Sequence, residues 1–137
     1  MKEKQSSFLS KTKYLNGLKC HKLLWYEYNR KEDLPEINAA TQAIMDQGKI
    51  VGELARTLFQ DGVVLQRDYA PDKQAEKSLE AAKLRKSLFE AGFVHKQAYA
   101  LADILNPVEK NAWDLIEVKS SSSVKDAHYS QYYVNLF

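Results

Sequence analysis

Apolar positions at helical spacing dominate the first half of the chain. Ser10 has the side chain of a helix N-cap, and apolar residues recur at loosely helical spacing from there to Trp25. Between Asn38 and about Gln60 the apolar residues share one helical face, which consists of Ile44, Val51, Leu54, Ala55 and Leu58. The pattern predicts two helices, the second packed against a core, joined by a polar loop that ends at Pro35.

A short strand and a third helix are predicted next. The apolar residues 63–65 follow the stop signal Asp61-Gly62, which is typical of a buried strand. Pro71 is suited to the first turn of a helix, and we expect this helix to run through Leu88 and end at Gly92.

The remaining pattern predicts a hairpin and a final helix. Residues 93–105 and 112–119 are strand-like, and the turn-rich segment 106–111 separates them. A serine run at residues 120–123 precedes a helix that Asp126 can cap. This order predicts an α/β or α+β fold, in which helices flank a small mixed sheet with a central hairpin.

Composition narrows the setting of this fold. The 137 residues suit one domain, and a net charge of +2 is too even to argue for a polyanionic partner by itself. The single cysteine, Cys20, excludes an intrachain disulfide and a cluster of several thiolates within this chain. No apolar run approaches the roughly 20 residues that cross a bilayer, and the first residues lack the pattern of a signal peptide. We therefore expect a cytoplasmic protein without a membrane partner.

The predicted hairpin carries the residues with the most informative chemistry. Asp103 lies near the end of its first strand, and the period of two places Glu117 and Lys119 on one face of its second. Antiparallel pairing brings the two carboxylates together, a combination suited to Mg²⁺ or Mn²⁺ and to phosphodiester hydrolysis. The alternative is a solvated strand face whose charges protect an edge, and the residues alone leave both interpretations open.

Asp103, then Glu117-Val118-Lys119, then a helix with Gln131 resembles the PD-(D/E)XK nuclease superfamily. The chain looks closest to the RecB-like branch, which includes CRISPR-associated exonucleases and uncharacterised bacterial relatives, and residues 14–25 are similar to its opening helix. The resemblance implies a restriction-endonuclease-like fold, a metal bound by Asp103, Glu117 and the carbonyl of Val118, and a catalytic Lys119. It also implies that Gln131 positions DNA together with Tyr132 or Tyr133.

The sequence departs from the branch at several positions. The position expected to hold a helix-borne His is Gly52, and Asn135 replaces the Tyr that usually follows the Gln. Iron–sulfur members use four cysteines, so we expect no such cluster in this chain alone and an inert, packed Cys20. Glu53 is predicted to be solvated, because it lies opposite the apolar face of its helix.

The sequence thus favours a Mg²⁺- or Mn²⁺-dependent DNA nuclease, and the RecB-like resemblance implies that its cleavage is exonucleolytic. Lys22 lies in a segment that interleaves basic and aromatic residues, a combination that suits single-stranded ends. The alternatives are a non-catalytic module that binds nucleic acid or protein with the same fold, and an unrelated domain with a coincidental Glu-Val-Lys triplet. Residues 1–137 are expected to form one nuclease domain, the N-terminal part of a longer protein with a possible further domain.

Overall fold

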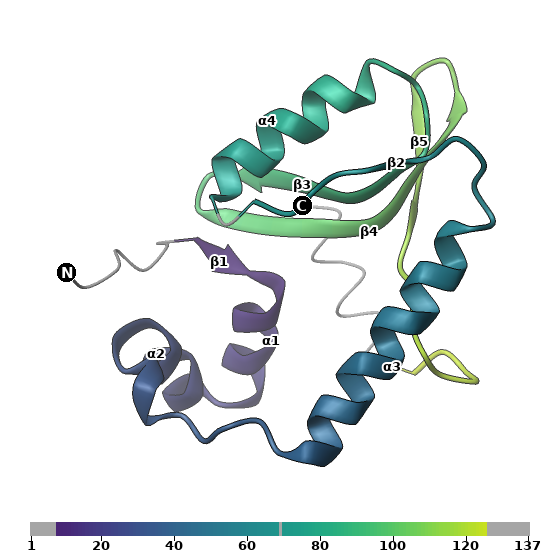
Figure 1. The fold of residues 1–137 in the computed structure, drawn as a ribbon. Coiled ribbons are helices and arrows are strands. Elements are labelled where there is room, and N and C mark those ends of the chain that lie inside the picture. Colours follow the sequence, from purple (N-terminus) through teal and green to yellow (C-terminus); the bar gives the residue numbers. More distant parts are fainter. Residues whose placement is uncertain (1–7, 69, 126–137) are drawn as a thin grey trace.

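A curled mixed sheet forms the centre of the computed structural model, which describes residues 8–68 and 70–125 (Figure 1). Its strands follow the order β1-β4-β3-β2, and β5 also pairs with β4. The two hairpin pairings, β3 with β4 and β4 with β5, are antiparallel, whereas β1 and β2 add in parallel. The strand bounds are β1 Leu9–Ser10, β2 Val63–Val64, β3 Leu88–His95, β4 Ala98–Glu109 and β5 Ala112–Ile116.

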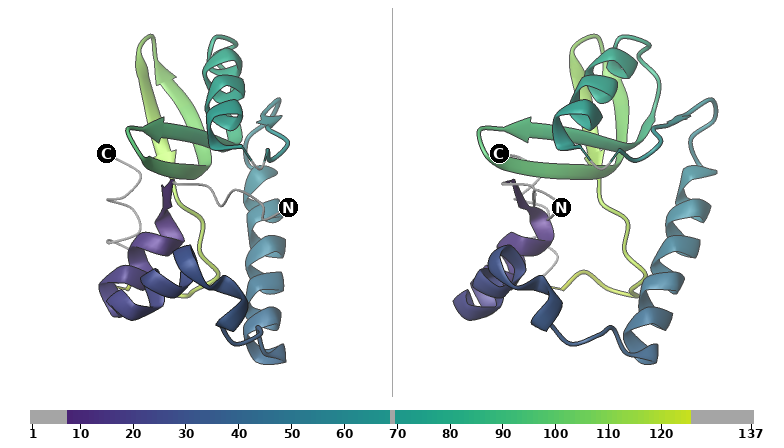
Figure 2. Two further views of the ribbon diagram at one scale, coloured as in Figure 1. Left: turned by 90° about the vertical axis from the view of Figure 1, so that its left-hand side faces the viewer. Right: turned by 60° about the vertical axis from the view of Figure 1, so that its left-hand side comes forward.

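Helices lie on both sides of this sheet, which confirms the predicted α+β class. They are α1 Lys11–Lys19, α2 His21–Asn29, α3 Ala39–Arg56 and α4 Pro71–Ala82, with a short 3-10 helix η1 at Lys31–Asp33. Helix α4 packs on one side of the sheet, α1 and α2 lie toward the other, and α3 extends away from it (Figure 2). No helix among the described residues is both long and apolar enough to cross a membrane.

The helix starts were predictable because their signals are local. The hydroxyl of Ser10 accepts a hydrogen bond from the Lys13 amide at 3.3 Å, and the Asn38 side chain accepts one from Thr41 at 2.8 Å. The first predicted helix is nevertheless split in two, because Cys20 adopts an extended conformation with φ of −159°. Cys20 is exposed at this junction, so the expectation of a packed thiol was wrong.

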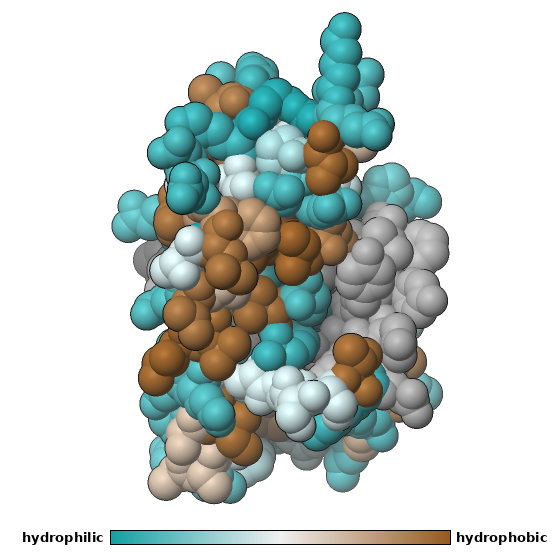
Figure 3. Space-filling model, turned by 90° about the vertical axis from the view of Figure 1, so that its right-hand side faces the viewer, coloured by the Kyte–Doolittle hydropathy of each residue, from teal (hydrophilic) through white to brown (hydrophobic). Residues whose placement is uncertain are grey.

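Helix α3 has the predicted position, but its apolar face is not packed against a core. The side chains of Ile44, Leu54 and Leu58 are 65%, 67% and 80% exposed. Figure 3 views the molecule from the side on which α3 lies and shows apolar side chains gathered in a band over this helix. The expected burial fails because α3 turns its opposite face, which holds its glycines and several charged residues, toward the sheet.

The third predicted helix is too long. Helix α4 ends at Ala82, and Leu88–His95 forms β3 instead of a last helical turn. Leu88 and Ala91 are completely buried in the core of the sheet. A short apolar run does not by itself distinguish a buried strand from a buried helix, and only the pairing with β4 decides the outcome.

The predicted strand over residues 93–105 is also two strands. The chain turns at Lys96, whose φ is 53°, and β4 begins at Ala98. The predicted hairpin is present as β4 and β5, although β4 continues to Glu109 and the turn is shorter than expected.

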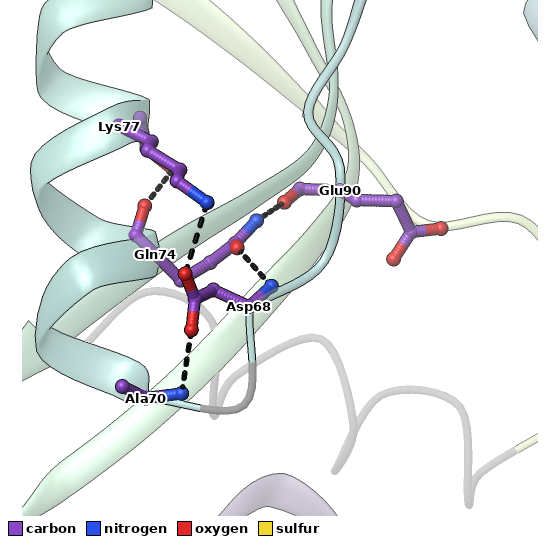
Figure 4. Close-up of polar contacts among 6 residues, drawn as sticks. Asp68, Ala70, Gln74, Lys77 and Glu90 are labelled. Carbon is purple, nitrogen blue, oxygen red and sulfur yellow. Dashed lines mark hydrogen bonds and ion pairs between the residues drawn. The ribbon is translucent and has the colours of Figure 1, made fainter.

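A buried polar network joins α4 to β3 (Figure 4). Gln74 is fully buried; its Nε2 donates to the carbonyl of Glu90 at 2.9 Å, and its Oε1 accepts from the amide of Asp68 at 2.7 Å. The hydroxyl of Ser78 accepts a hydrogen bond from the Gly92 amide at 2.7 Å. The two elements approach so closely that a Cβ at Gly92 would lie 2.5 Å from Cγ of Gln74. This network therefore sets the position of β3 at Glu90.

We expect Gln74→Leu to lower the free energy of unfolding by about 2–4 kcal/mol, because it leaves the Glu90 carbonyl and the Asp68 amide without their partner. Urea denaturation measures the change. The matched control is Lys73→Ala on the exposed side of α4, which should change stability by less than about 0.5 kcal/mol. A loss below about 1 kcal/mol for Gln74→Leu would show that the network contributes little.

Candidate functional site

A cleft of about 460 Å³ lies between α3, the sheet and the chain that follows β5. Residues from four elements line it, although they are far apart in the sequence. They are Met45, Gly48, Lys49, Gly52, Glu53 and Arg56 of α3, Glu90 of β3, Asp103 and Ile104 of β4, and Val118, Lys119 and Ser120 after β5.

Asp103 and Glu117 come together through the register of β4 and β5. Ile104 pairs with Ile116 in this antiparallel ladder, and the next position along places Asp103 beside Glu117. Regular pairing ends at Ile116, and there the amide of Val118 donates to Oδ2 of Asp103 at 2.8 Å. The predicted juxtaposition of the two carboxylates is therefore present, just beyond the end of the strand.

Glu117 is the shared acceptor in a cluster of two ion pairs. Its Oε1 accepts from Nζ of Lys119 at 2.7 Å and from Nζ of Lys11 at 2.8 Å, and its side chain is only 8% exposed. Lys119 was predicted from the local spacing, whereas Lys11 was not. Lys11 lies 106 residues away, and it reaches the site because β1, which directly precedes it, pairs with β4.

Burial and charge move the pKa values of the two carboxyls in opposite directions. Burial raises the pKa of Asp103 and the nearby charge of Glu117 adds to the rise, although the Val118 hydrogen bond opposes it. Burial alone would also raise the pKa of Glu117, but hydrogen bonds from Lys11 and Lys119 outweigh it and the net pKa is lowered. The site thus contains one carboxyl with a raised pKa beside one with a lowered pKa.

A second ion pair closes the other side of the cleft. Nη2 of Arg56 on α3 lies 2.7 Å from Oε1 of Glu90 on β3. Glu90 occupies the register position opposite Asp103, because its neighbours Phe89 and Ala91 pair with Ile104 and Ala102. Neither residue was predicted, since Glu90 lay inside the expected helix. The available signal was a single acidic residue within an otherwise apolar run.

The other residues singled out from the sequence have mixed outcomes. Glu53 is exposed as predicted, and it also lines the cleft. Lys22 lies on α2 and does not line the cleft; its Nζ is 5.9 Å from the centre of the Tyr26 ring. Gln131 and Tyr132 lie outside the described residues.

The donor atoms beside Asp103 are oxygens that suit Mg²⁺ or Mn²⁺. They belong to the carboxylates of Asp103 and Glu117, and the resemblance adds the main-chain carbonyl of Val118, a residue that lines the cleft. Within residues 8–68 and 70–125, no three or more His, Cys, Asp or Glu side chains are grouped so that they could hold a metal ion. Mg²⁺ commonly uses only one or two carboxylates and keeps several waters, so two carboxylates and a carbonyl fit this ion.

Comparisons with protein-family models, curated proteins and solved structures found no match for this chain. The resemblance to PD-(D/E)XK nucleases therefore stays a prediction from the residues, and any assignment of function has to come from the geometry of the cleft.

We expect Asp103→Asn to stabilise the metal-free protein at pH 7 and Glu117→Gln to destabilise it. The raised pKa of Asp103 means that its charged form costs stability once the pH passes its ordinary value of 3.8, and asparagine removes this cost. The lowered pKa of Glu117 means that its stabilising effect is present above its ordinary value of 4.5 and is lost as the pH falls through the lower folded value.

Denaturation of the wild type and both variants in EDTA, at pH 7 and at about pH 3, measures these effects. Both differences from the wild type should shrink at the lower pH, because Asp103 is then protonated in the folded and unfolded states and the stabilising effect of Glu117 declines as the pH approaches its lowered folded pKa. The assignment is contradicted if the two variants shift stability in the same direction at pH 7.

Proposed function

We propose that this chain is a divalent-metal-dependent nuclease domain that hydrolyses phosphodiester bonds in DNA. The observation that carries the proposal is the meeting of Asp103, Glu117 and Lys119 beside a cleft, whose wall includes Asp103 and Lys119. Two carboxylates and an ammonium side by side are the groups that metal-assisted phosphoryl chemistry requires. A solvated strand face does not account for a Glu117 side chain that is only 8% exposed.

Each residue has a role that follows from its position. Asp103, Glu117 and the Val118 carbonyl would hold Mg²⁺ or Mn²⁺, which activates water and offsets the charge that develops on the phosphate. The Val118 amide keeps the Asp103 carboxylate oriented toward this point. Lys119 lines the cleft and donates to a phosphate oxygen or orients the attacking water. Lys11 offsets the negative charge of Glu117 through its ion pair with Oε1.

The finer assignments rest on the resemblance and on the composition of the sequence. We place the reaction in the cytoplasm, take single-stranded DNA ends as the substrate, and assign exonucleolytic cleavage. Gln131 and Tyr132 are proposed to position the strand, and Lys22 to bind its backbone away from the cleft. An iron–sulfur cluster is not proposed for this chain, which contains a single cysteine.

A second candidate function is a non-catalytic module that binds nucleic acid or a protein partner. The observation that favours it is the double ion pair of Glu117, whose Oε1 already accepts from Lys11 and Lys119. A metal ion at Glu117 has to compete with these two ammonium groups. If the competition fails, the same cleft remains a binding surface without hydrolytic chemistry.

Glu117→Ala and Lys119→Ala should each lower the rate of DNA cleavage at least about 100-fold, because each removes a group that acts on the reacting phosphate or water. The assay follows release of nucleotides from labelled single-stranded DNA with Mn²⁺ or Mg²⁺. Asp114→Asn is the matched control, since Asp114 is exposed on β5 at a position that points away from Glu117. Cleavage that survives both alanine substitutions would exclude this site.

Metal binding separates the two candidate functions. A nuclease should melt at a higher temperature with millimolar Mn²⁺ than in EDTA, and Asp103→Asn should remove the difference. A wild-type melting temperature that neither Mn²⁺ nor Mg²⁺ changes, together with no cleavage, favours the binding module.

A further inference from the structure

The proposed reaction leaves the α3 side of the cleft without a role. Arg56 and Lys49 lie two turns apart on the face of α3 that lines the cleft, with side chains that are 28% and 68% exposed. Gly48 and Gly52 line the cleft from the same face, and a Cβ at either position would meet no atom within 4 Å. Glu53 also lines this wall, so the wall combines charged side chains of both signs with open space.

Glu90 holds an unusual backbone conformation directly across from Arg56. Its φ is 61°, in the left-handed region that costs a residue with a side chain of this size about 1 kcal/mol or more. The surrounding structure maintains this conformation, because the buried Gln74 side chain donates to the Glu90 carbonyl and the neighbours Phe89 and Ala91 are buried. Strain that is retained by a buried network is typical of functional positions.

This backbone conformation places the Glu90 carboxylate against Arg56 at the cleft. It accepts a hydrogen bond from Nη2 of Arg56 at 2.7 Å, and the Arg56 guanidinium also lies 5.7 Å from the centre of the Phe89 ring. A guanidinium has five N–H donors in a planar fork, so one bond to Glu90 leaves donors for a second anion. Glu90 and Phe89 together restrict Arg56 to one orientation at the edge of the cleft.

We propose that Arg56 binds a phosphodiester of the nucleic-acid strand next to the reacting phosphate, and that Glu90 is the positioning residue that orients it. This inference rests on the proposed function for its substrate class. The guanidinium fork matches two phosphate oxygens, whereas a lysine offers only a point charge. The competing explanation is an ion pair that only fastens α3 to the sheet.

Binding of a fluorescent oligo(dT) strand in EDTA, measured over a range of salt concentrations, tests the assignment without catalysis. Arg56→Gln should weaken binding about tenfold and reduce the slope of log affinity against log salt by about 0.7, as expected for one lost phosphate contact. Arg56→Lys should keep the wild-type slope with a smaller loss of affinity. Lys83→Gln is the control, since it removes one positive charge from an exposed pair on α4 outside the cleft.

Glu90→Gln tests the positioning role through its dependence on Arg56. It should weaken binding in the wild-type background and have no effect in the Arg56→Gln background. A carboxylate that only repels DNA gives the opposite result, which is tighter binding in both backgrounds and overturns the positioning role. Thermal melting of every variant checks that only folded proteins are compared.

The outcomes distinguish this inference from the proposed function. If Arg56→Gln binds DNA with the wild-type affinity and the wild-type salt dependence, the phosphate site is rejected, even if the chain cleaves DNA with Mn²⁺. Conversely, loss of binding by Arg56→Gln in a chain that cleaves nothing supports the phosphate site and rejects the nuclease. When cleavage is present, Arg56→Gln should raise KM with little change in kcat, because the contact is made equally in the ground and transition states.

Discussion

The pairing of β4 with three other strands is the constraint on which the site depends. β1 and β5 pair along one edge of β4 and β3 along the other, and each brings one group to the neighbourhood of Asp103. Lys11 directly follows β1, Glu90 lies within β3, and Glu117 directly follows β5. Backbone hydrogen bonds thus gather groups that are up to 106 residues apart, and a shift of one residue in register would turn their side chains to the opposite face.

The charged groups at this strand cost stability, and their arrangement shows how the fold tolerates them. A buried carboxylate beside another one is unfavourable, which is why the pKa of Asp103 is raised. Two lysines offset the second carboxylate, and one backbone amide fixes the first. At Glu90 the cost is a strained backbone, which a buried glutamine on α4 maintains. Charge and strain concentrated at one cleft distinguish it from an ordinary polar surface.

Helix α3 contributes to the cleft in an unexpected way. An amphipathic helix normally buries its apolar face, yet α3 presents glycines and charged side chains to the cleft and leaves Ile44, Leu54 and Leu58 exposed. The polar face is the one that carries chemistry, through Arg56 and its partner Glu90. The orientation of the helix therefore does not follow from its hydrophobic pattern, and the ion pair of Arg56 with Glu90 links α3 to the sheet.

The sequence by itself determined the features that depend on neighbouring residues. The sequence predicted the cap at Ser10, the starts of α3 near Asn38 and of α4 at Pro71, and the hairpin that joins Asp103 to Glu117. All of them involve short separations, where local propensity and a short turn leave few alternatives. Only the tertiary structure decided that residues 88–95 form a strand, that Lys11 reaches Glu117, and which face of α3 meets the cleft. Those outcomes depend on contacts between distant segments, and a local pattern of apolar residues contains no information about which distant segment will supply the partner.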